Sequence, residues 1–540
     1  MTASASGSGA DRLARIHAHL RAIDHAVYVS TSVPAASSPD PDKLATVLPP
    51  EAKAFLATLA DRFRDEVRQL HLVRQERQLQ LDLCSTIDEA RSLCVFRNGP
   101  YPDGDNWTIN PLPQILRDRR VDIGDTSPAR TDELVSALNS GAQGVQVDMD
   151  DGHCPSWKNV IHGHWNLLHA VRGKLPGITA SPALLLPRPR AWNMDEENVL
   201  VNGHVMPGAL FDFGVHMFHS GAHLTSTGRG PFFYLPKLES ADEAALWTRI
   251  FAYTEATLGI PQHTIKAVVL IEHILAAFEM DAILFAMRHY SAGLNCGMWD
   301  YTASILSKFR AFPEASLPDR QAFVSMQTPF LSHYMHLLIA TCKKRQAPAT
   351  TGMAPFVLAG ATPDAQAAMR LKTTTGKTLE ARAGADGALV FDPALVPLVQ
   401  DIFATTAATG AVLPAPSPRD LLVLPQGHVT LQSVEFNLRV VLAYIESWVR
   451  QEGIAVLDNC VEDSATAEIA RSQLWHWIKY QQRLQDSNIV VSLGLIHSLL
   501  GPLVPRVSPA TRRLALHVLQ VQGFPTFLTT FLQHQRLVWE

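Results

Sequence analysis

The sequence lacks the features that would place it in three common protein classes. Its six cysteines are scattered with no CxxC pair, which argues against a disulfide framework or a zinc site and favours a reducing, cytosol-like compartment. No apolar run is long enough to cross a bilayer. The net charge is only −5 with 22 histidines taken as neutral, so no basic surface for nucleic acid is expected. The composition therefore predicts an enzyme-like globular protein with neither a membrane nor a nucleic-acid partner.

Targeting signals are also lacking at both ends of the sequence. Met1 to Asp11 is small and polar, without the apolar core of a secretion signal. The last residues, Leu537-Val538-Trp539-Glu540, do not form a peroxisomal address of the Ser-Lys-Leu type. We therefore expect a cytoplasmic protein and consider a peroxisomal location less favoured.

The chain is too long for one ordinary hydrophobic core, because it has 540 residues. Residues 1–48 are rich in Ser, Ala and Pro and are predicted to form a flexible lead. Residues 49–105 are predicted to form a helical segment, because Leu56, Leu59 and Phe63 recur at helical spacing. The first part of the chain thus precedes the main catalytic domain.

Residues 106–400 alternate between candidate strands and helical stretches, as in a parallel α/β sheet. At this length a closed (β/α)8 TIM barrel is favoured over an open sheet, and barrel active sites lie at the C-terminal ends of the strands. A junction rich in Ala, Pro and Thr starts at Leu389, and residues 401–540 are predicted to form an all-helical C-terminal domain. The candidate strands are 145–148, 183–186, 232–235, 267–271, 294–296 and 353–357.

Two carboxylates follow candidate strands of this barrel. Glu272 ends the apolar run Val268–Ile271, and Asp300 follows a short strand whose two glycines allow a close approach of the backbone. The two acids are about one strand-helix-strand unit apart. In a parallel barrel they would lie side by side, where they could share one metal ion. Spacing alone slightly favours two unrelated acids at strand ends.

The stretch Gly-Leu-Asn-Cys-Gly-Met-Trp-Asp-Tyr, residues 293–301, is similar to the signature of the malate synthases, specifically the shorter A-type enzymes. Other blocks resemble this family in the family's order, from about Leu48 to near the C-terminus. These blocks are 206–213 (MPGALFDF), 230–237 (GPFFYLPK), 317–320 (LPDR) and 462–469 (EDSATAEI).

The resemblance implies a Claisen condensation of acetyl-CoA with glyoxylate, followed by hydrolysis of the thioester, as in the glyoxylate cycle. By the same resemblance, Glu272 and Asp300 hold the metal ion. Two hard carboxylates without a His or Cys partner suit Mg²⁺. Backbone N–H groups from Gly297 through Met298 and Trp299 to Asp300 are expected to bind a glyoxylate oxygen.

The resemblance also supplies residues for proton transfer. Asp463 matches the catalytic base, although composition alone would make it a helix cap. Arg188 matches the arginine that stabilises the enolate, a role that suits the permanent charge of a guanidinium. Asp150 and Asp151 are expected to lie just outside the metal ligands. The residues that resemble a loop near the acyl-CoA channel are Gly352, Met353 and Pro355.

The sequence departs from the family pattern at Met298, Ala191, Asn193 and His273. Because these residues belong to the expected lining, they leave open which acyl donor and which oxo acid are used. A related condensing enzyme with altered substrates, or one that stops at the CoA thioester, is therefore an alternative. A non-catalytic CoA-binding paralog is a second alternative, against which the complete set of reacting residues argues. The oligomeric state is left open.

Overall fold

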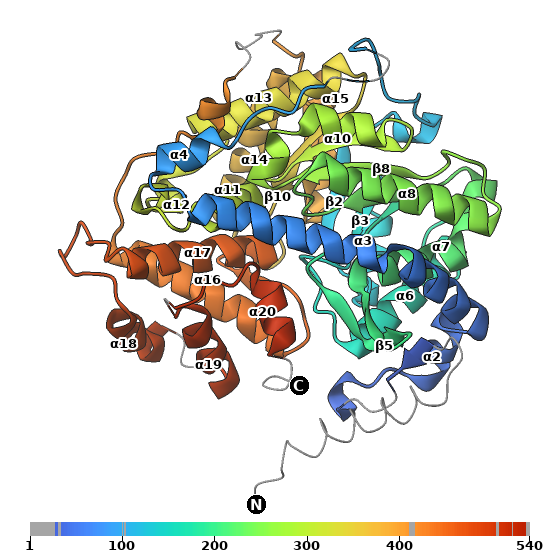
Figure 1. Cartoon of the computed structure of the whole chain (residues 1–540), viewed down its shortest axis with the longest axis horizontal. Coiled ribbons are helices and arrows are strands. Elements are labelled where there is room, and N and C mark those ends of the chain that lie inside the picture. The colour runs from blue at the N-terminus through green and yellow to red at the C-terminus, as the bar shows by residue number, and fades with distance from the viewer. Residues whose placement is uncertain are drawn as a thin grey trace, which may run out of the picture.

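Eight parallel strands form a closed barrel in the middle of the chain (Figure 1). The computed structural model describes residues 27–30, 34–99, 101, 104–409, 416–503, 507–520 and 522–535. The hydrogen-bonded order is β4-β3-β2-β11-β10-β9-β8-β7, and β4 also contacts β7, which closes the ring. The predicted TIM barrel is confirmed. Its strands are β2 (Val121–Thr126), β3 (Gly144–Asp148), β4 (Leu184–Arg188), β7 (Phe232–Leu235), β8 (Lys266–Ile271), β9 (Ser291–Cys296), β10 (Ala349–Ala354) and β11 (Gly387–Val390).

Helices cover the outside of the barrel, and several have clear end signals. Ser156, Ser240 and Thr362 cap helix starts through their side chains, and Gly228 and Gly259 end helices in the left-handed conformation that glycine adopts easily. The helices are α5 (Thr131–Leu138), α6 (Trp157–Val171), α7 (Gly208–Thr227), α8 (Ala241–Leu258), α9 (Ile274–Ala277), α10 (Met280–Met287), α11 (Met298–Lys308), α12 (Arg320–Phe323), α13 (Pro329–Lys344), α14 (Pro363–Ala383) and α15 (Val396–Thr405).

The structure corrects the start of the junction that was expected from Leu389 onward. Leu389 and Val390 belong to β11, the last barrel strand, and α15 follows soon after. The strand escaped prediction because it has only four residues, of which two are Gly and Ala. The strand expected at 353–357 also lies earlier, in β10.

Part of the N-terminal stretch is tied to the barrel. β1 (Val27–Val29) pairs with β5 (Asp195–Val201), which pairs with β6 (His204–Pro207) in a small antiparallel sheet between β4 and α7. α2 (Pro41–Val47) is capped by Asp40 and contacts α6. The amphipathic patch from Asp11 to Ile23 lies outside the described residues.

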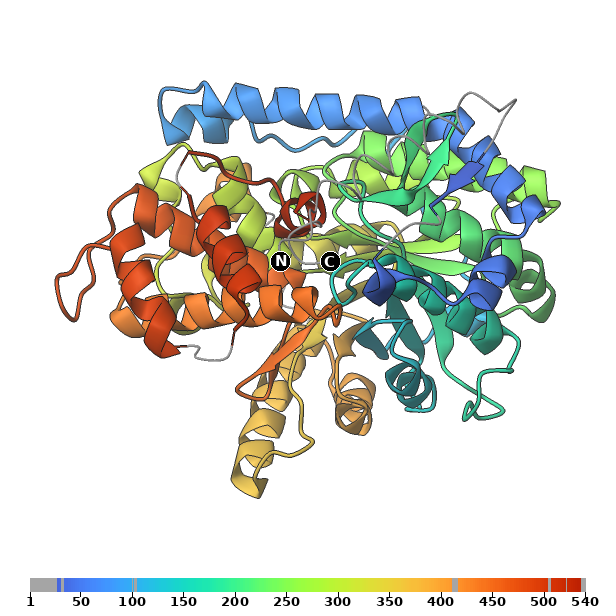
Figure 2. The same cartoon turned by 90° about the horizontal axis from the view of Figure 1, so that it is seen from below.

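The long helix α3 (Pro50–Asp82) lies across the outer face of the molecule (Figure 2). It contacts α7, α8 and α11, with Phe55, Leu56 and Leu59 buried along one side. Near its C-terminal half, Arg74 forms a buried ion pair with Glu243 of α8, 2.6 Å from Nη2 to Oε2. The short helix α4 (Ile87–Ser92) follows α3.

The C-terminal helices lie beside the barrel and have a separate hydrophobic core that includes Val434, Leu438 and Trp448 (Figure 1). In the described part of the chain, no helix has both the length and the apolar character required for a membrane span. These helices are α16 (Leu431–Val449), α17 (Ser464–Lys479), α18 (Leu493–Leu503), α19 (Pro509–Val518) and α20 (Leu528–His534).

A short hairpin corrects the expectation of a purely helical C-terminal part. β12 (Ala455–Leu457) and β13 (Cys460–Glu462) pair directly before α17. The turn residues Asp458 and Asn459 both have positive φ, 51° and 59°, as a two-residue hairpin turn requires. The hairpin also reaches the barrel, since the N–H of Val461 donates to the carbonyl of Pro355 at 2.8 Å.

Candidate active site

The C-terminal ends of the barrel strands bring the predicted residues to one cavity of about 230 Å³. Arg188 is the last residue of β4, Glu272 follows β8, and Gly297 connects β9 to α11. Asp300 lies in the first turn of α11. Asp463, from the C-terminal helices, lines the same cavity. Residues far apart in the sequence therefore meet where a TIM barrel carries its active site.

Three acidic side chains form the candidate metal site. Asp151, Glu272 and Asp300 each offer one carboxylate oxygen, and these oxygens lie within 4.8 Å of one another. Burial raises the pKa of Glu272 to about 7 and that of Asp300 well above its ordinary value. A divalent cation would supply the positive charge that keeps both groups ionised, and oxygen-only ligands fit a hard cation.

Asp151 differs from the other two acids because its charge is already balanced. Oδ1 lies 2.5 Å from Nζ of Lys237, and Oδ2 lies 2.8 Å from Nη1 of Arg188. Although burial opposes it, the charges of Lys237 and Arg188 lower the pKa of Asp151 to about 2. Glu272 and Asp300 therefore fit the direct ligand positions best, with Asp151 beside them.

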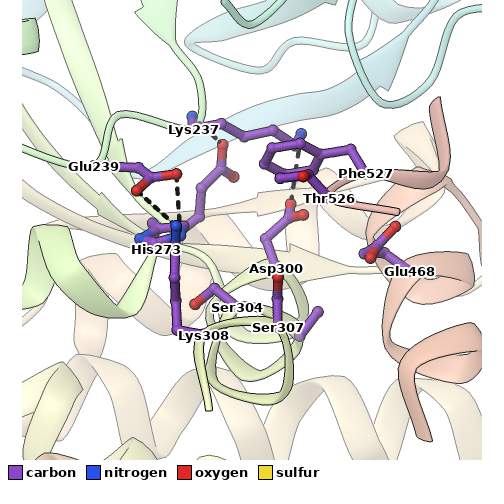
Figure 3. Close-up of a pocket in the computed structure, with 12 residues that line it drawn as sticks. Lys237, Glu239, His273, Asp300, Ser304, Ser307, Lys308, Glu468, Thr526 and Phe527 are labelled. Carbon is purple, nitrogen blue, oxygen red and sulfur yellow. Dashed lines mark hydrogen bonds and ion pairs between the residues drawn. The ribbon is translucent and has the colours of Figure 1, made fainter. Parts of the chain in front are cut away.

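Lys237 is a residue of this cluster that the sequence analysis missed. It lies just after β7, and its ammonium is 2.5 Å from Oδ2 of Asp150. The ammonium is also 3.8 Å from Oδ2 of Asp300, the pair drawn in Figure 3. Its backbone N–H donates to Oε1 of Glu272 at 2.7 Å. Its position at the end of the family-like block 230–237, directly after a strand, was the available signal.

Arg188 is held by carboxylates from two neighbouring strands. Nε lies 2.7 Å from Oδ1 of Asp148, which ends β3, and Nη2 lies 2.5 Å from Oδ2 of the same residue. Nη2 also donates to Oδ1 of Asp125 in β2 at 2.9 Å. By contrast, Arg190 is buried against Asp212 and does not line the cavity. Of the two neighbouring arginines, only Arg188 is in contact with the site.

Asp463 is the N-cap of α17, and its Oδ1 accepts the N–H of Thr466 at 2.9 Å. Burial and the nearby charge of Asp151 raise the pKa of Asp463. The next residue, Ser464, donates its N–H to the carbonyl of Asp151 at 3.4 Å. The β12–β13 hairpin and this contact fix the carboxyl group at the cavity.

The cavity lining also includes Met298 and Trp299 from α11 together with Gly352, Met353 and Pro355 from the end of β10. The last three residues were expected near the acyl-CoA channel. They border the same cavity as Asp463.

Of the four departures from the family pattern, Met298 lines this cavity. His273 borders a smaller cavity that shares Glu272 and Asp300 with it, and Ala191 and Asn193 line neither cavity. Ala191 donates its N–H to Oδ1 of Asp150 at 2.9 Å. Asn193 donates to Oγ1 of Thr530 at 2.8 Å. His273 accepts the N–H of Leu275 at 3.2 Å at the start of α9. The question of altered substrates therefore concerns Met298 in the reaction cavity first, with His273 next to Glu272.

A second, smaller cavity of about 20 Å³ shares Glu272 and Asp300 with the larger one. Asp300 is seen in its lining in Figure 3. Thr526 and Phe527 border it from the C-terminal part, and Glu239 lies 2.9 Å from Nζ of Lys308 inside its wall. Its polar lining and volume fit about one water molecule. Asp300 therefore borders both the larger cavity and a space that fits a water molecule.

Comparisons with known proteins agree with this geometry. The family description "Malate synthase, TIM barrel domain" matches residues 184–412, and "Malate synthase, C-terminal" matches residues 428–515. The malate synthase of Dictyostelium discoideum is 37% identical over 481 residues, which cover 83% of this chain and 85% of that protein. The malate synthase of Myxococcus xanthus is 38% identical over 472 residues, covering 85% of each chain. Malate synthase A of Escherichia coli is 36% identical over 472 residues, covering 84% and 86%. The chain belongs to the malate synthase family.

Proposed function

We propose that the chain carries out the malate synthase reaction with Mg²⁺ at Glu272 and Asp300, Arg188 beside the enolate and Asp463 as the base. The overall reaction is that of the family, in which acetyl-CoA condenses with glyoxylate and hydrolysis releases malate and CoA. One observation carries the assignment of roles. All four side chains line a single cavity, although they come from the barrel and from the C-terminal helices.

The metal site fits Mg²⁺ by its ligand chemistry. Glu272 and Asp300 offer hard oxygen ligands, and neither His nor Cys takes part in the described cluster. Asp151 and Lys237 border the site and form an ion pair, so their charges offset each other. When bound there, the ion would act as a Lewis acid that polarises and orients the glyoxylate aldehyde.

In this proposal, Asp463 takes a proton from the acetyl methyl group. Its carboxylate becomes a neutral acid as the enolate forms, and the charge of Arg188 offsets the new negative charge. A guanidinium has five N–H donors. Among the described residues, four of them contact Asp148, Asp125 and Asp151. The remaining N–H on Nη1 is available to the enolate oxygen.

The start of α11 is suited to the carboxylate of glyoxylate. The N–H groups of Met298, Trp299 and Asp300 belong to the first turn of the helix and have no intrahelical acceptor. The N–H of Gly297 was expected to join them, but it donates to Oη of Tyr334 at 2.9 Å. Three backbone donors therefore remain for the substrate.

A second candidate function is condensation with a different acyl-CoA or 2-oxo acid. Met298 favours it, because this departure from the family pattern lines the reaction cavity. We further propose a cytoplasmic location, supported by six cysteines that are all free thiols.

One assay separates these functions. The purified protein is mixed with Mg²⁺, glyoxylate or another 2-oxo acid, and a panel of acyl-CoAs, and release of free CoA is followed. We expect the highest kcat/KM with acetyl-CoA and glyoxylate. A higher value for another pair would support the altered-substrate function, and CoA binding without any turnover would contradict both.

A further inference from the structure

Asp125 is a second carboxyl group that lines the same cavity as the proposed base. It lies in β2 and is buried. Its side chain is within hydrogen-bonding reach of Asp463. Neither the family-like motifs nor the metal cluster includes it.

The contacts of Asp125 show that its two oxygens differ. Oδ1 accepts a hydrogen bond from Nη2 of Arg188 at 2.9 Å. Oδ2 is buried and receives no hydrogen bond from any donor among the described residues. Two carboxyl groups in contact are stable when one of them carries a proton, because two carboxylates at that distance repel each other. A proton on Oδ2 of Asp125 would give this oxygen a hydrogen bond, donated to the carboxylate of Asp463.

The contacts favour this proton on Asp125: its Oδ2 is buried without a donor among the described residues, whereas Oδ1 of Asp463 accepts the N–H of Thr466 at 2.9 Å. Burial and the adjacent charge of Asp463 raise the pKa of Asp125 well above its ordinary value. Asp463 is also raised, but the N–H of Thr466 stabilises its ionised form. The charged and titratable groups that act on this pair are Arg188, Asp148, Asp151, Asp300, Arg320, Tyr444 and Glu462.

The backbone of Asp125 supports a functional position. Its φ is +48°, in the left-handed region that few residues other than glycine adopt. Asp and Asn tolerate this region better than most residues, but it still costs free energy. The bend occurs near the C-terminal end of β2, where the carboxyl group turns toward Arg188 and Asp463.

We infer that Asp125 is a positioning residue that, as a neutral carboxylic acid, donates a hydrogen bond to the carboxylate of Asp463 and accepts one from Arg188. This inference rests on the proposed function, because it concerns the base and the enolate-stabilising cation. In the reaction, the methyl C–H bond breaks and an O–H bond forms on Asp463, while Asp125 keeps its own proton. One side chain thus aligns Asp463, which removes the methyl proton, with Arg188, which stabilises the negative charge of the enolate.

Two substitutions test whether Asp125 is a neutral hydrogen-bond donor or an ionised partner of Arg188. Asp125→Asn keeps a donor toward Asp463 and an acceptor for Arg188, and Asp125→Gly removes both. Both residues tolerate positive φ, so backbone strain does not confound the comparison. Asp122→Asn is the matched control, because Asp122 lies in the same strand and is bound to Arg119 and Tyr234 instead, outside the cavity lining.

The kinetic measurement is the pH profile of methyl-proton exchange in acetyl-CoA with Mg²⁺ present. We expect Asp125→Asn to retain most of the wild-type rate and its acidic limb. Asp125→Gly should lose about 10- to 100-fold, the usual effect of a hydrogen bond to a charged group, and its acidic limb should move to higher pH. Asp122→Asn should leave the limb in place. A loss in Asp125→Asn as large as in Asp125→Gly, with the limb moved to lower pH, would overturn the inference.

An infrared measurement tests the inference independently of turnover. With Mg²⁺ present at pH 7, the wild-type minus Asp125→Asn difference spectrum should contain the C=O band of a protonated carboxylic acid. A carboxylate band in its place would show that Asp125 is ionised and would overturn the inference even if the enzyme proved inactive. A protonated band in a protein without methyl-proton exchange would instead refute the proposed function while leaving the neutral state of Asp125 supported.

Discussion

Nη1 of Arg188 lies 2.8 Å from Oδ2 of Asp151. The cation proposed for the enolate therefore shares a carboxylate with the candidate metal site. The other oxygen of Asp151 contacts Lys237, which in turn lies near Asp300. Charges on neighbouring strands form one buried array, so a change in one member should affect metal binding and turnover in distinguishable ways.

Replacing Arg188 by Lys should lower kcat by about 10²-fold or more, comparable to the loss of one oxyanion donor. Lysine keeps the charge but has no planar fork of donors, so it cannot serve Asp148, Asp125 and Asp151 together. Steady-state kinetics would measure the effect. Arg190→Lys, outside the cavity, should lower the melting temperature more than the turnover of the folded protein. A near-normal rate in Arg188→Lys would refute the role given to this residue.

Asp300→Asn should abolish activity and weaken Mg²⁺ binding. The amide preserves the size of the side chain but removes the charge that would hold the ion. Calorimetric titration with Mg²⁺ measures the affinity, and the exposed Asp364→Asn serves as a control for the loss of one negative charge. Full activity of the wild-type protein after exhaustive chelation would contradict the metal assignment.

Gly297→Ala should weaken Mg²⁺ binding without removing any ligand. A Cβ at this position would lie 2.9 Å from Cβ of Glu272 and 3.4 Å from its Oε2, so Glu272 would have to shift. Gly376→Ala is the matched control, because its Cβ would have no neighbour within 4 Å, and alanine in a helix interior should stabilise by up to about 1 kcal/mol. Equal Mg²⁺ affinities for Gly297→Ala and wild type would show that Glu272 is not placed as described.

His216 should make stability depend on pH. Burial lowers its pKa from 6.5 to about 3, so the unfolded chain binds the extra proton first as the solution is acidified. Its contribution to stability is present above pH 6.5 and is lost progressively as pH falls toward 3. Urea unfolding at several pH values should show a flatter dependence in His216→Leu, by up to about 1.4 kcal/mol per pH unit. His204 is exposed, so the pH dependence of stability in His204→Gln should follow wild type. If stability in His216→Leu changed with pH in parallel with wild type, burial of neutral His216 would not be the cause of the pH dependence.

The sequence was most informative where the backbone itself is constrained. The two glycines of residues 293–301 were expected to allow close approach, and this prediction is confirmed. A Cβ at Gly293 would collide with the carbonyl of Pro348, and one at Gly297 with Glu272. Such positions are readable because few residues other than glycine can occupy them.

Polar residues inside the barrel were harder to predict. β2 contains Asp122 and Asp125, which a strand pattern normally excludes. Both are buried because partners from distant strands compensate them: Arg119 and Tyr234 for Asp122, and Arg188 for Asp125. A single sequence does not show which residues will become neighbours across a barrel. Lys237 was missed for the same reason, since its partners come from the loop after β3 and from α11.

The most direct test of the account is methyl-proton exchange in acetyl-CoA by wild type and by Asp463→Asn. Asp463 caps α17 of the C-terminal part, whereas Glu272 and Asp300 belong to the barrel domain, so the variant should keep nearly normal affinity for Mg²⁺ and glyoxylate. We predict that wild type exchanges the methyl protons and that Asp463→Asn exchanges them about 10²- to 10⁴-fold more slowly, the usual effect of losing a general base. Exchange by Asp463→Asn as fast as in wild type would place the base elsewhere and contradict the role of the C-terminal helices in catalysis.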